Sequence, residues 1–228
     1  MNLAIIPARL GSKRLQQKNI KKFFGKPIIS YSIKAAKKTK IFDKIIVSTE
    51  SIKLKKIAEK FGAEVPFLRP RKIADDKTHF NDAIIHTIKE LKKRNNSIKN
   101  ICCIYPTSPL IDYKDIIKGF NLLKKSSSYV FSVCQYVSPP QRSFYFKNGN
   151  LKFLMSNNYK KRSQDLNKIY HDAGQFYWGR EQTWLNDKII FNKRSKIIEI
   201  NYLNFMDINY LKDFNMAKKL YRTVLSKK

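Results

Sequence analysis

Short apolar segments alternate with amphipathic helical patterns over the first 136 residues, and this alternation restricts the fold more than any other feature. The predicted strands are rich in β-branched or aromatic residues and are continuously apolar, as in strands covered on both faces. They span residues 3–7, 44–49, 64–68, 100–106 and 129–136. Apolar residues recur at intervals of three and four, as in helices, over residues 28–39, 51–61, 80–94 and 113–125. The alternation predicts an α/β fold, doubly wound around a mostly parallel sheet.

The pattern changes after residue 137. The segment "SFYFKNGNLKFL" alternates aromatic and aliphatic residues across Asn148-Gly149, which predicts a two-residue hairpin. A polar, basic stretch, "SNNYKKRSQDLNK", follows as a flexible loop or arm, and then "IYHDAGQFYWG". A strand at 196–201 and an amphipathic helix near 210–226 end the sequence. We therefore expect one domain over residues 1–228, with an inserted hairpin and a possible dimerisation arm at about 138–170.

The chain is strongly basic, with 47 Lys and Arg against 17 Asp and Glu and a formal net charge of +30. Clustered cations would suggest a nucleic-acid partner. Here lysines occur in every segment, including the polar faces of ordinary helical patterns, so most of the charge is expected on solvated surfaces. We predict no nucleic-acid partner, and a basic nucleic-acid-binding module stays open as the alternative from another functional class. A positive surface would raise encounter rates with small anionic substrates.

The sequence shows neither a signal peptide nor a membrane span. Charge follows Pro7 directly, and no apolar run approaches the roughly 20 residues that cross a bilayer. Cys102, Cys103 and Cys134 lie in apolar runs without metal-ligand spacing, which indicates reduced core thiols. We expect a cytoplasmic protein without a membrane partner.

The first predicted strand leads into "ARLGSKRLQQKN", where cations surround a Gly-Ser pair. Ligands of open α/β sheets bind beyond the carboxyl ends of the strands. Gly11 and Ser12 can turn backbone N–H groups toward phosphate there, and four side chains can neutralise its charge: Arg9, Lys13, Arg14 and Lys18. The spacing matches neither the Walker A nor the dinucleotide pattern. A merely solvated basic loop therefore remains possible on physical grounds.

Seven motifs occur in a family-specific order: "IIPARLGSKRLQQKN", "GKPIISYSI", "KIIVST", "LRP", "IADDKT", "YPTSPL" and a late "MDIN". From residue 3 to about 220 the chain resembles the CMP-sialate synthetase family, the cytidylyltransferases that make CMP-activated acid sugars. Within that family, "YHDAGQFYWG" most resembles the pseudaminic acid cytidylyltransferases. The resemblance implies a Rossmann-like nucleotide-diphospho-sugar transferase fold with helices on both faces of the sheet.

The resemblance also implies a CTP site. Arg9, Ser12, Lys13 and Lys18 would hold the triphosphate together with Gly11, and Asn19 would support the loop. The region around cytosine and ribose would include Arg69, Ala74, Asp76 and Thr78. Without the resemblance, Arg69 would be assigned as a solvated arginine.

The acid-sugar site would lie in two other segments. In "YPTSPL", Thr107 and Ser108 present hydroxyls at the end of a strand, although they could equally cap a helix. The family usually has Gln or Ala at or near Tyr105, so the position of this loop carries over better than any contact by Tyr105. In "YHDAGQFY" the implied sugar contacts are His171, Asp172 and Gln175.

A metal site is implied by "MDIN". An Asp207 carboxylate can bind Mg²⁺ while the cation bridges triphosphate oxygens. The family pattern is commonly Asp-Ile-Asp, and Asn209 replaces the second carboxylate here, so we expect weaker Mg²⁺ binding or a carboxylate from elsewhere. Asp207 could instead cap the last helix. Arg9, Lys18 and Asp207 are the implied catalytic residues.

The implied reaction is transfer of CMP from CTP to the anomeric hydroxyl of a nine-carbon α-keto acid sugar, with release of pyrophosphate. Pseudaminic acid is the first substrate to test, and synthesis of CMP-sialate, CMP-legionaminate or CMP-Kdo is the alternative within the class. The family dimerises through its inserted region, so a homodimer is also implied.

Overall fold

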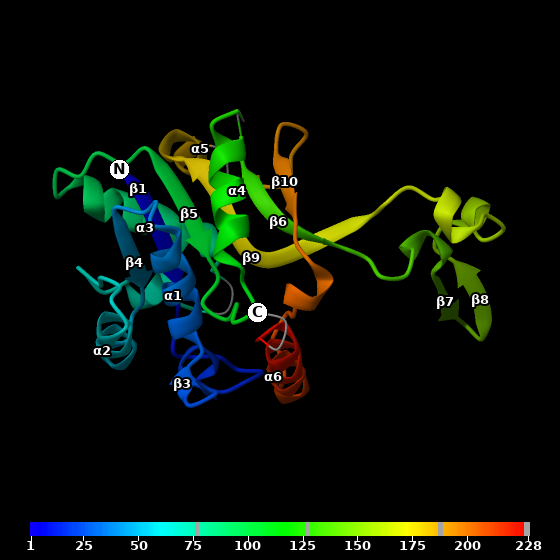
Figure 1. Ribbon diagram of the computed structural model, residues 1–228, viewed down its shortest axis with the longest axis horizontal. Coiled ribbons are helices and arrows are strands. Elements are labelled where there is room, and N and C mark those ends of the chain that lie inside the picture. The colour runs from blue at the N-terminus through cyan, green and yellow to red at the C-terminus, as the bar shows by residue number, and fades with distance from the viewer. Residues whose placement is uncertain (76–77, 126–127, 187–188, 226–228) are drawn as a thin grey trace.

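The computed structural model describes residues 1–75, 78–125, 128–186 and 189–225, and it is built around a six-stranded sheet of order β10-β6-β9-β5-β1-β4 (Figure 1). Its strands are β1 (Asn2–Pro7), β4 (Lys44–Ser48), β5 (Asn100–Ile104), β6 (Val130–Gln135), β9 (Tyr170–Arg180) and β10 (Lys196–Glu199). The expected mostly parallel sheet is confirmed. β1 pairs in parallel with both β4 and β5, and β10 pairs in parallel with β6.

Two sequence expectations for the sheet were incomplete. The segment 64–68 was predicted as a strand, but it contributes only an isolated bridge between Glu64 and Ile46. The segment "YHDAGQFYWG" had no predicted conformation, and it forms β9, which runs antiparallel between β5 and β6. A register shift between Phe131 and Val133 interrupts its pairing with β6.

Helices cover both faces of the sheet, as predicted. The longer ones are α1 (Ile29–Thr39), α2 (Ile52–Lys60), α3 (Phe80–Lys92), α4 (Tyr113–Leu123) and α6 (Leu211–Leu225), with a short α5 (Glu181–Asn186). Alternate residues of β1 point to opposite faces. Ala4 and Ile6 pack with α1, α2 and α4, whereas Leu3 and Ile5 pack with α3 and α5. The buried apolar runs seen in the sequence therefore form two cores, one on each side of the sheet.

Two small hairpins stand outside this sheet. β2 (Lys22–Phe23) and β3 (Lys26–Pro27) lie beside α6 (Figure 1). β7 (Phe144–Lys147) and β8 (Asn150–Phe153) form an arm that projects from the body of the molecule (Figure 1). Asn148 and Gly149 have positive φ angles of 51° and 74°, as the predicted two-residue turn requires. The arm continues through short 3₁₀ turns, Ser156–Asn158 and Ser163–Asp165.

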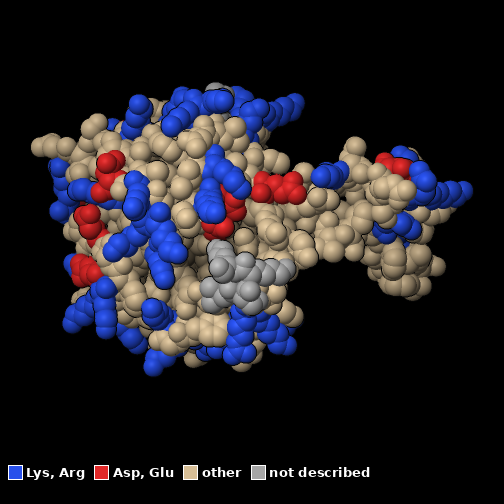
Figure 2. All heavy atoms as spheres, viewed as in Figure 1, with Lys and Arg blue, Asp and Glu red and all other residues tan. Residues whose placement is uncertain are grey.

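The surface agrees with the expected spread of charge. Figure 2 shows Lys and Arg side chains on both the helical body and the arm, with fewer acidic side chains between them. Cys102, Cys103 and Cys134 are buried and free, as predicted. Among the described residues, no helix is long and apolar enough to cross a membrane.

Candidate active site

A cleft of about 800 Å³ opens at the carboxyl ends of β1 and β5. Because β4 lies on one side of β1 and β5 on the other, the order of the strands reverses at this point of the sheet. This is the topological switch point at which open α/β sheets bind ligands. Predicted site residues from five separate segments line the cleft: Arg9, Ser12, Lys13, Lys18, Asn19, Arg69, Ala74, Thr78, Thr107, Asp172 and Asn209. The fold thus brings most of the predicted nucleotide residues to one place, together with two of the five predicted sugar residues, Thr107 and Asp172.

The loop after β1, residues 8–19, carries the cations of the cleft. Its backbone turns tightly where Ser12 N–H donates to the carbonyl of Leu10 (3.0 Å). The buried Asn19 amide donates to the carbonyl of Arg9 (2.7 Å), which fits the predicted support of the loop. Lys18 Nζ donates to the carbonyl of Ile208 (2.6 Å), so this lysine ties the loop to the "MDIN" segment. Burial lowers the pKa of Lys18, and nearby Asp207 opposes that shift.

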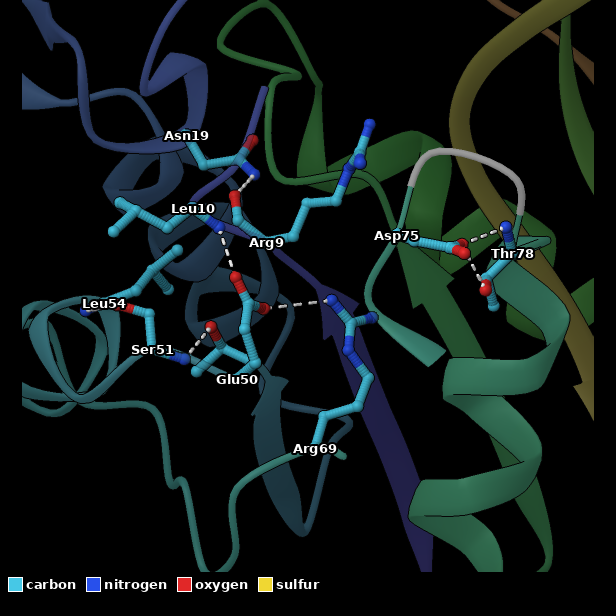
Figure 3. A network of polar contacts seen from close by, with 10 residues as sticks. Arg9, Leu10, Asn19, Glu50, Ser51, Leu54, Arg69, Asp75 and Thr78 are labelled. Atoms are coloured by element: carbon cyan, nitrogen blue, oxygen red, sulfur yellow. Dashed lines mark hydrogen bonds and ion pairs between the residues drawn. The ribbon is translucent and has the colours of Figure 1, made fainter. Parts of the chain in front are cut away.

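Arg69 lies on another wall of the cleft and is only 6% exposed, so it is not the solvated arginine that the sequence alone would suggest. Its NH2 group faces Glu50 Oε2 at 3.4 Å (Figure 3). The other oxygen of Glu50 accepts a hydrogen bond from Leu10 N–H (2.8 Å). Burial lowers the pKa of Arg69, and the carboxylate of Glu50 counteracts this change. One acidic side chain thus contacts both the cationic loop and the buried arginine.

Residues 73–75 and 78–80 lie at the wall that was predicted for cytosine and ribose. Thr78 donates to Asp75 Oδ1 through both its backbone N–H (2.7 Å) and its hydroxyl (2.6 Å), as Figure 3 shows. Ala74 and Asp75 line the cleft, and so do His79 and Phe80 at the start of α3. Asp76, predicted for the same site, lies outside the described residues.

Asp172, Tyr177 and Tyr105 form the wall made by β9 and the end of β5. Tyr177 donates its hydroxyl to Asp172 Oδ2 (2.6 Å), and Gly174 N–H donates to Asp172 Oδ1 (2.9 Å). The latter bond needs the positive φ of Gly174 (55°), a conformation that glycine adopts without strain. Burial raises the pKa of Tyr177 and Tyr105, so both phenols stay neutral donors. The Asp172 side chain itself is exposed to the cleft and can accept further hydrogen bonds.

Several predicted residues are not among those lining the cleft. The His171 ring packs between Tyr136 and Phe205, at centroid distances of 4.8 and 4.6 Å. Gln175 is buried, and its amide donates to the carbonyl of Asn204 (2.6 Å). The remaining three are the buried Ser108 and the exposed Gly11 and Asp207. A Cβ on Gly11 would meet nothing within 4 Å, so sterics do not require glycine there.

The structure does not show the helix-capping roles that were the alternatives for Thr107, Ser108 and Asp207. Helix α4 is capped by Asp112, whose carboxylate accepts from Lys114 N–H (2.9 Å), rather than by Thr107 or Ser108. At the start of α6, the carboxylate that accepts backbone N–H groups is that of Asp213, from Asn209 (2.9 Å) and Tyr210 (2.7 Å). Asp207 instead accepts from the side chain of Asn209 (2.6 Å).

The residues of the predicted metal site suit a cation that is only partly held by protein. The Asp207 carboxylate is exposed and adjoins the amide of Asn209, which lines the cleft. Within the described residues, no three His, Cys, Asp or Glu side chains form a metal-binding group. Mg²⁺ commonly binds through one or two protein ligands, with the other positions filled by substrate phosphates and water. Asp207 and Asn209 fit Mg²⁺ on those terms.

Sequence reasoning missed four residues that shape this site: Glu50, Asp75, Tyr177 and Asp213. Glu50 directly follows "KIIVST", so its place after a parallel strand was a usable signal. Asp213 lies three residues after Tyr210 at a helix start, a capping-box spacing that could also have been read. For Asp75 and Tyr177 no signal in the residues alone would have sufficed.

Comparisons with known proteins agree with this geometry. The family model described as cytidylyltransferase matches residues 3–227. The chain is 38% identical to the pseudaminic acid cytidylyltransferase of Campylobacter jejuni, over 97% of this chain and 96% of that protein. It is 28% identical to the CMP-N,N'-diacetyllegionaminic acid synthase of Legionella pneumophila, over 96% of this chain and 95% of that one.

A solved structure shows the same fold. That of CMP:2-keto-3-deoxy-manno-octonic acid synthetase complexed with CTP superimposes with a TM-score of 0.73, covering 97% of this chain and 98% of the other at 13% identity. This likeness supports the expected transferase fold. Because the family match extends over nearly the whole sequence, the chain belongs to the cytidylyltransferase family.

Proposed function

We propose that the chain transfers CMP from CTP to the anomeric hydroxyl of pseudaminic acid, a nine-carbon α-keto acid sugar. The observation that carries this proposal is its 38% identity, along nearly its full length, to a pseudaminic acid cytidylyltransferase. The cleft supports it chemically. It combines a cationic loop for a polyanion with a wall of hydrogen-bonding groups around Asp172, which suits a polar sugar.

The reaction needs two substrates held in line. The anomeric oxygen of the sugar attacks the α-phosphorus of CTP and forms a new P–O bond, while the bond between that phosphorus and the bridging oxygen breaks. Pyrophosphate leaves with the electron pair, and the hydroxyl proton passes to a base or to solvent. Arg9, Lys13 and Lys18 would neutralise the triphosphate, so positioning and charge stabilisation supply most of the rate.

Mg²⁺ is part of the proposal. Asp207 and Asn209 would hold it together with oxygens of the substrate. When bound, the cation would supply positive charge that stabilises the developing pyrophosphate. Lys18 reaches the same segment through the carbonyl of Ile208, so the protein's own charge lies beside the place where metal would bind.

A homodimer is also part of the proposal. Cross-strand partners in the arm place Phe144, Phe146, Leu151 and Phe153 on one face of the two-stranded sheet. All four side chains are exposed in the single chain. A two-stranded hairpin is marginally stable alone in water, and an apolar face of this kind favours burial against a second copy.

Pyrophosphate release against a panel of acid sugars tests the substrate. With CTP, pseudaminic acid should be turned over with the highest kcat/KM among pseudaminic, sialic, legionaminic and Kdo acids. UTP in place of CTP is the nucleotide control and should be a poor substrate, because a mismatched buried polar group costs about 1–3 kcal/mol. Preference for one of the other three sugars would reject the substrate assignment.

A further inference from the structure

Glu50 lies between two parts of the cleft that are far apart in sequence. It lies two residues after the end of β4, and its Oε1 accepts a hydrogen bond from Leu10 N–H at 2.8 Å. Its Oε2 faces NH2 of Arg69 at 3.4 Å. Figure 3 shows this carboxylate between the loop after β1 and the arginine. Glu50 is thus a bridge between the cationic loop and the opposite wall.

A carboxylate is an unfavourable neighbour for a polyanion. Its charge repels phosphate, so electrostatics alone would favour a neutral side chain at this position. The Glu50 side chain is also largely buried, with 17% of its surface exposed. A buried carboxylate that repels phosphate must therefore make contacts that offset this cost.

Arg69 is the buried cation that Glu50 compensates. A buried guanidinium is costly unless a charged or polar partner compensates it, and Glu50 is that partner. The backbone of Arg69 is fixed as well, because its N–H donates to the carbonyl of Thr49 (2.8 Å). Within the described residues, the buried Nε of Arg69 has no hydrogen-bond partner. Arg69 also lines the cleft, so its guanidinium group can face a ligand with acceptor oxygens.

We propose that Glu50 is a positioning residue for the cytidylyl transfer, which fixes the distance between the backbone of the triphosphate loop and the guanidinium of Arg69. One oxygen holds the loop at Leu10, and the other holds Arg69 with its remaining donors free for a nucleoside triphosphate. The inference rests on the proposed use of CTP, but it does not depend on which acid sugar is the second substrate.

CTP binding to the full chain, measured by calorimetry without sugar, provides the test. Glu50→Gln removes the charge that faces Arg69, and Glu50→Ala removes both contacts. Both variants should bind CTP about 10-fold to 100-fold more weakly, since small misplacements at such sites have effects of this size. The matched control is Glu59→Gln, which removes a carboxylate from an exposed pair with Lys55 on α2 and should leave CTP affinity unchanged.

The direction of the change in CTP affinity of Glu50→Gln distinguishes a positioning role from simple charge repulsion. If Glu50 acts only through its charge, Glu50→Gln should bind CTP more tightly, because a repulsive carboxylate has gone. Equal or tighter CTP binding in this variant would overturn the proposal. Circular dichroism and thermal melting check that the variants are folded, and if Glu50→Ala does not fold, the glutamine variant decides alone.

Steady-state kinetics separate a positioning role from general damage. The KM for CTP should rise and kcat should fall in Glu50→Gln, with the KM for sugar unchanged. An equal rise in both KM values would contradict the role assigned to Glu50. Wild-type chain that binds CTP but turns over no acid sugar would reject the proposed substrate and leave the Glu50 result valid.

Discussion

Lys18 is the residue in the cleft whose charge depends most clearly on its surroundings. Burial lowers its pKa below the ordinary lysine value, and Lys18 must be protonated to attract triphosphate. CTP use should therefore weaken as pH rises through this lowered pKa, earlier than an unperturbed lysine near pKa 10.4 would allow. In Lys18→Arg the side chain stays charged, and the alkaline fall in kcat/KM for CTP should disappear.

A pH profile of kcat/KM for CTP on both proteins checks this prediction. The sign follows from the direction of the shift, since a base with a depressed pKa loses its proton at lower pH. An alkaline fall that persists unchanged in Lys18→Arg would assign the titration to another group.

Asp172 is the residue on which sugar recognition should depend most. It is exposed to the cleft and held by the Tyr177 hydroxyl and by Gly174 N–H. Asp172→Asn should raise the sugar KM about tenfold or more, because hydrogen bonds to charged groups contribute about 1.5–3 kcal/mol. His171 is another sugar contact that the resemblance implied in this segment, and His171→Ala should have the smaller effect, because its ring lies between Tyr136 and Phe205.

Kinetics at varied sugar and at saturating CTP compare these two variants directly. A larger effect of His171→Ala would restore the original assignment from the sequence and would place the sugar closer to Tyr136. If Asp172→Asn raised only the KM for CTP, the β9 wall would have to be assigned to nucleotide binding and not to sugar binding.

The residues show what the sequence could predict and why the rest was hidden. Cations such as Arg9 and Lys18 were found because they belong to the loop that follows the first strand, and a local pattern is enough to place them. Tyr177 was missed because it lies five residues beyond Asp172 on the same strand. A regular strand would put the two on opposite faces, but the register shift near Phe131 and the positive φ of Gly174 change that geometry.

At the scale of elements, the start of α6 sets the position of the proposed metal ligands. Asp213, in the first turn, accepts the N–H groups of Asn209 and Tyr210, and these hydrogen bonds lower its pKa. Lys18 contacts the carbonyl between Asp207 and Asn209. The segment is therefore held from both sides.

Asn209→Asp tests the metal at this element. An added hard anionic oxygen beside Asp207 should lower, severalfold, the Mg²⁺ concentration for half-maximal rate. Asp207→Ala should remove most activity with little loss of stability, because Asp207 does not cap α6. Mg²⁺ titrations of rate and of thermal melting on both variants decide the outcome. An unchanged Mg²⁺ response in both would exclude this segment from metal binding.

The elements were predicted with uneven success for a physical reason. Helices α1 to α4 matched their expected ranges closely, because each has a strong period of apolar residues. Residues 64–68 are apolar enough for a strand, but only Glu64 bridges to β4. The antiparallel direction of β9 could not be seen, because strand direction depends on the connection around the arm and not on local pattern.

At the scale of the whole molecule, the arm carries the strongest prediction about assembly. Phe146 and Leu151 are cross-strand partners, 72% and 44% exposed, on the apolar face of the hairpin. Replacing both with lysine places two charges where a second copy would bury apolar surface, so the molecular mass in solution should shift from dimer to monomer. Lys152, opposite Tyr145, belongs to the other face, so Lys152→Gln is the matched control and should remain dimeric. Light scattering after size exclusion measures the mass. A wild-type chain that is monomeric at micromolar concentration, or a double variant that stays dimeric, would show that the arm does not join two copies.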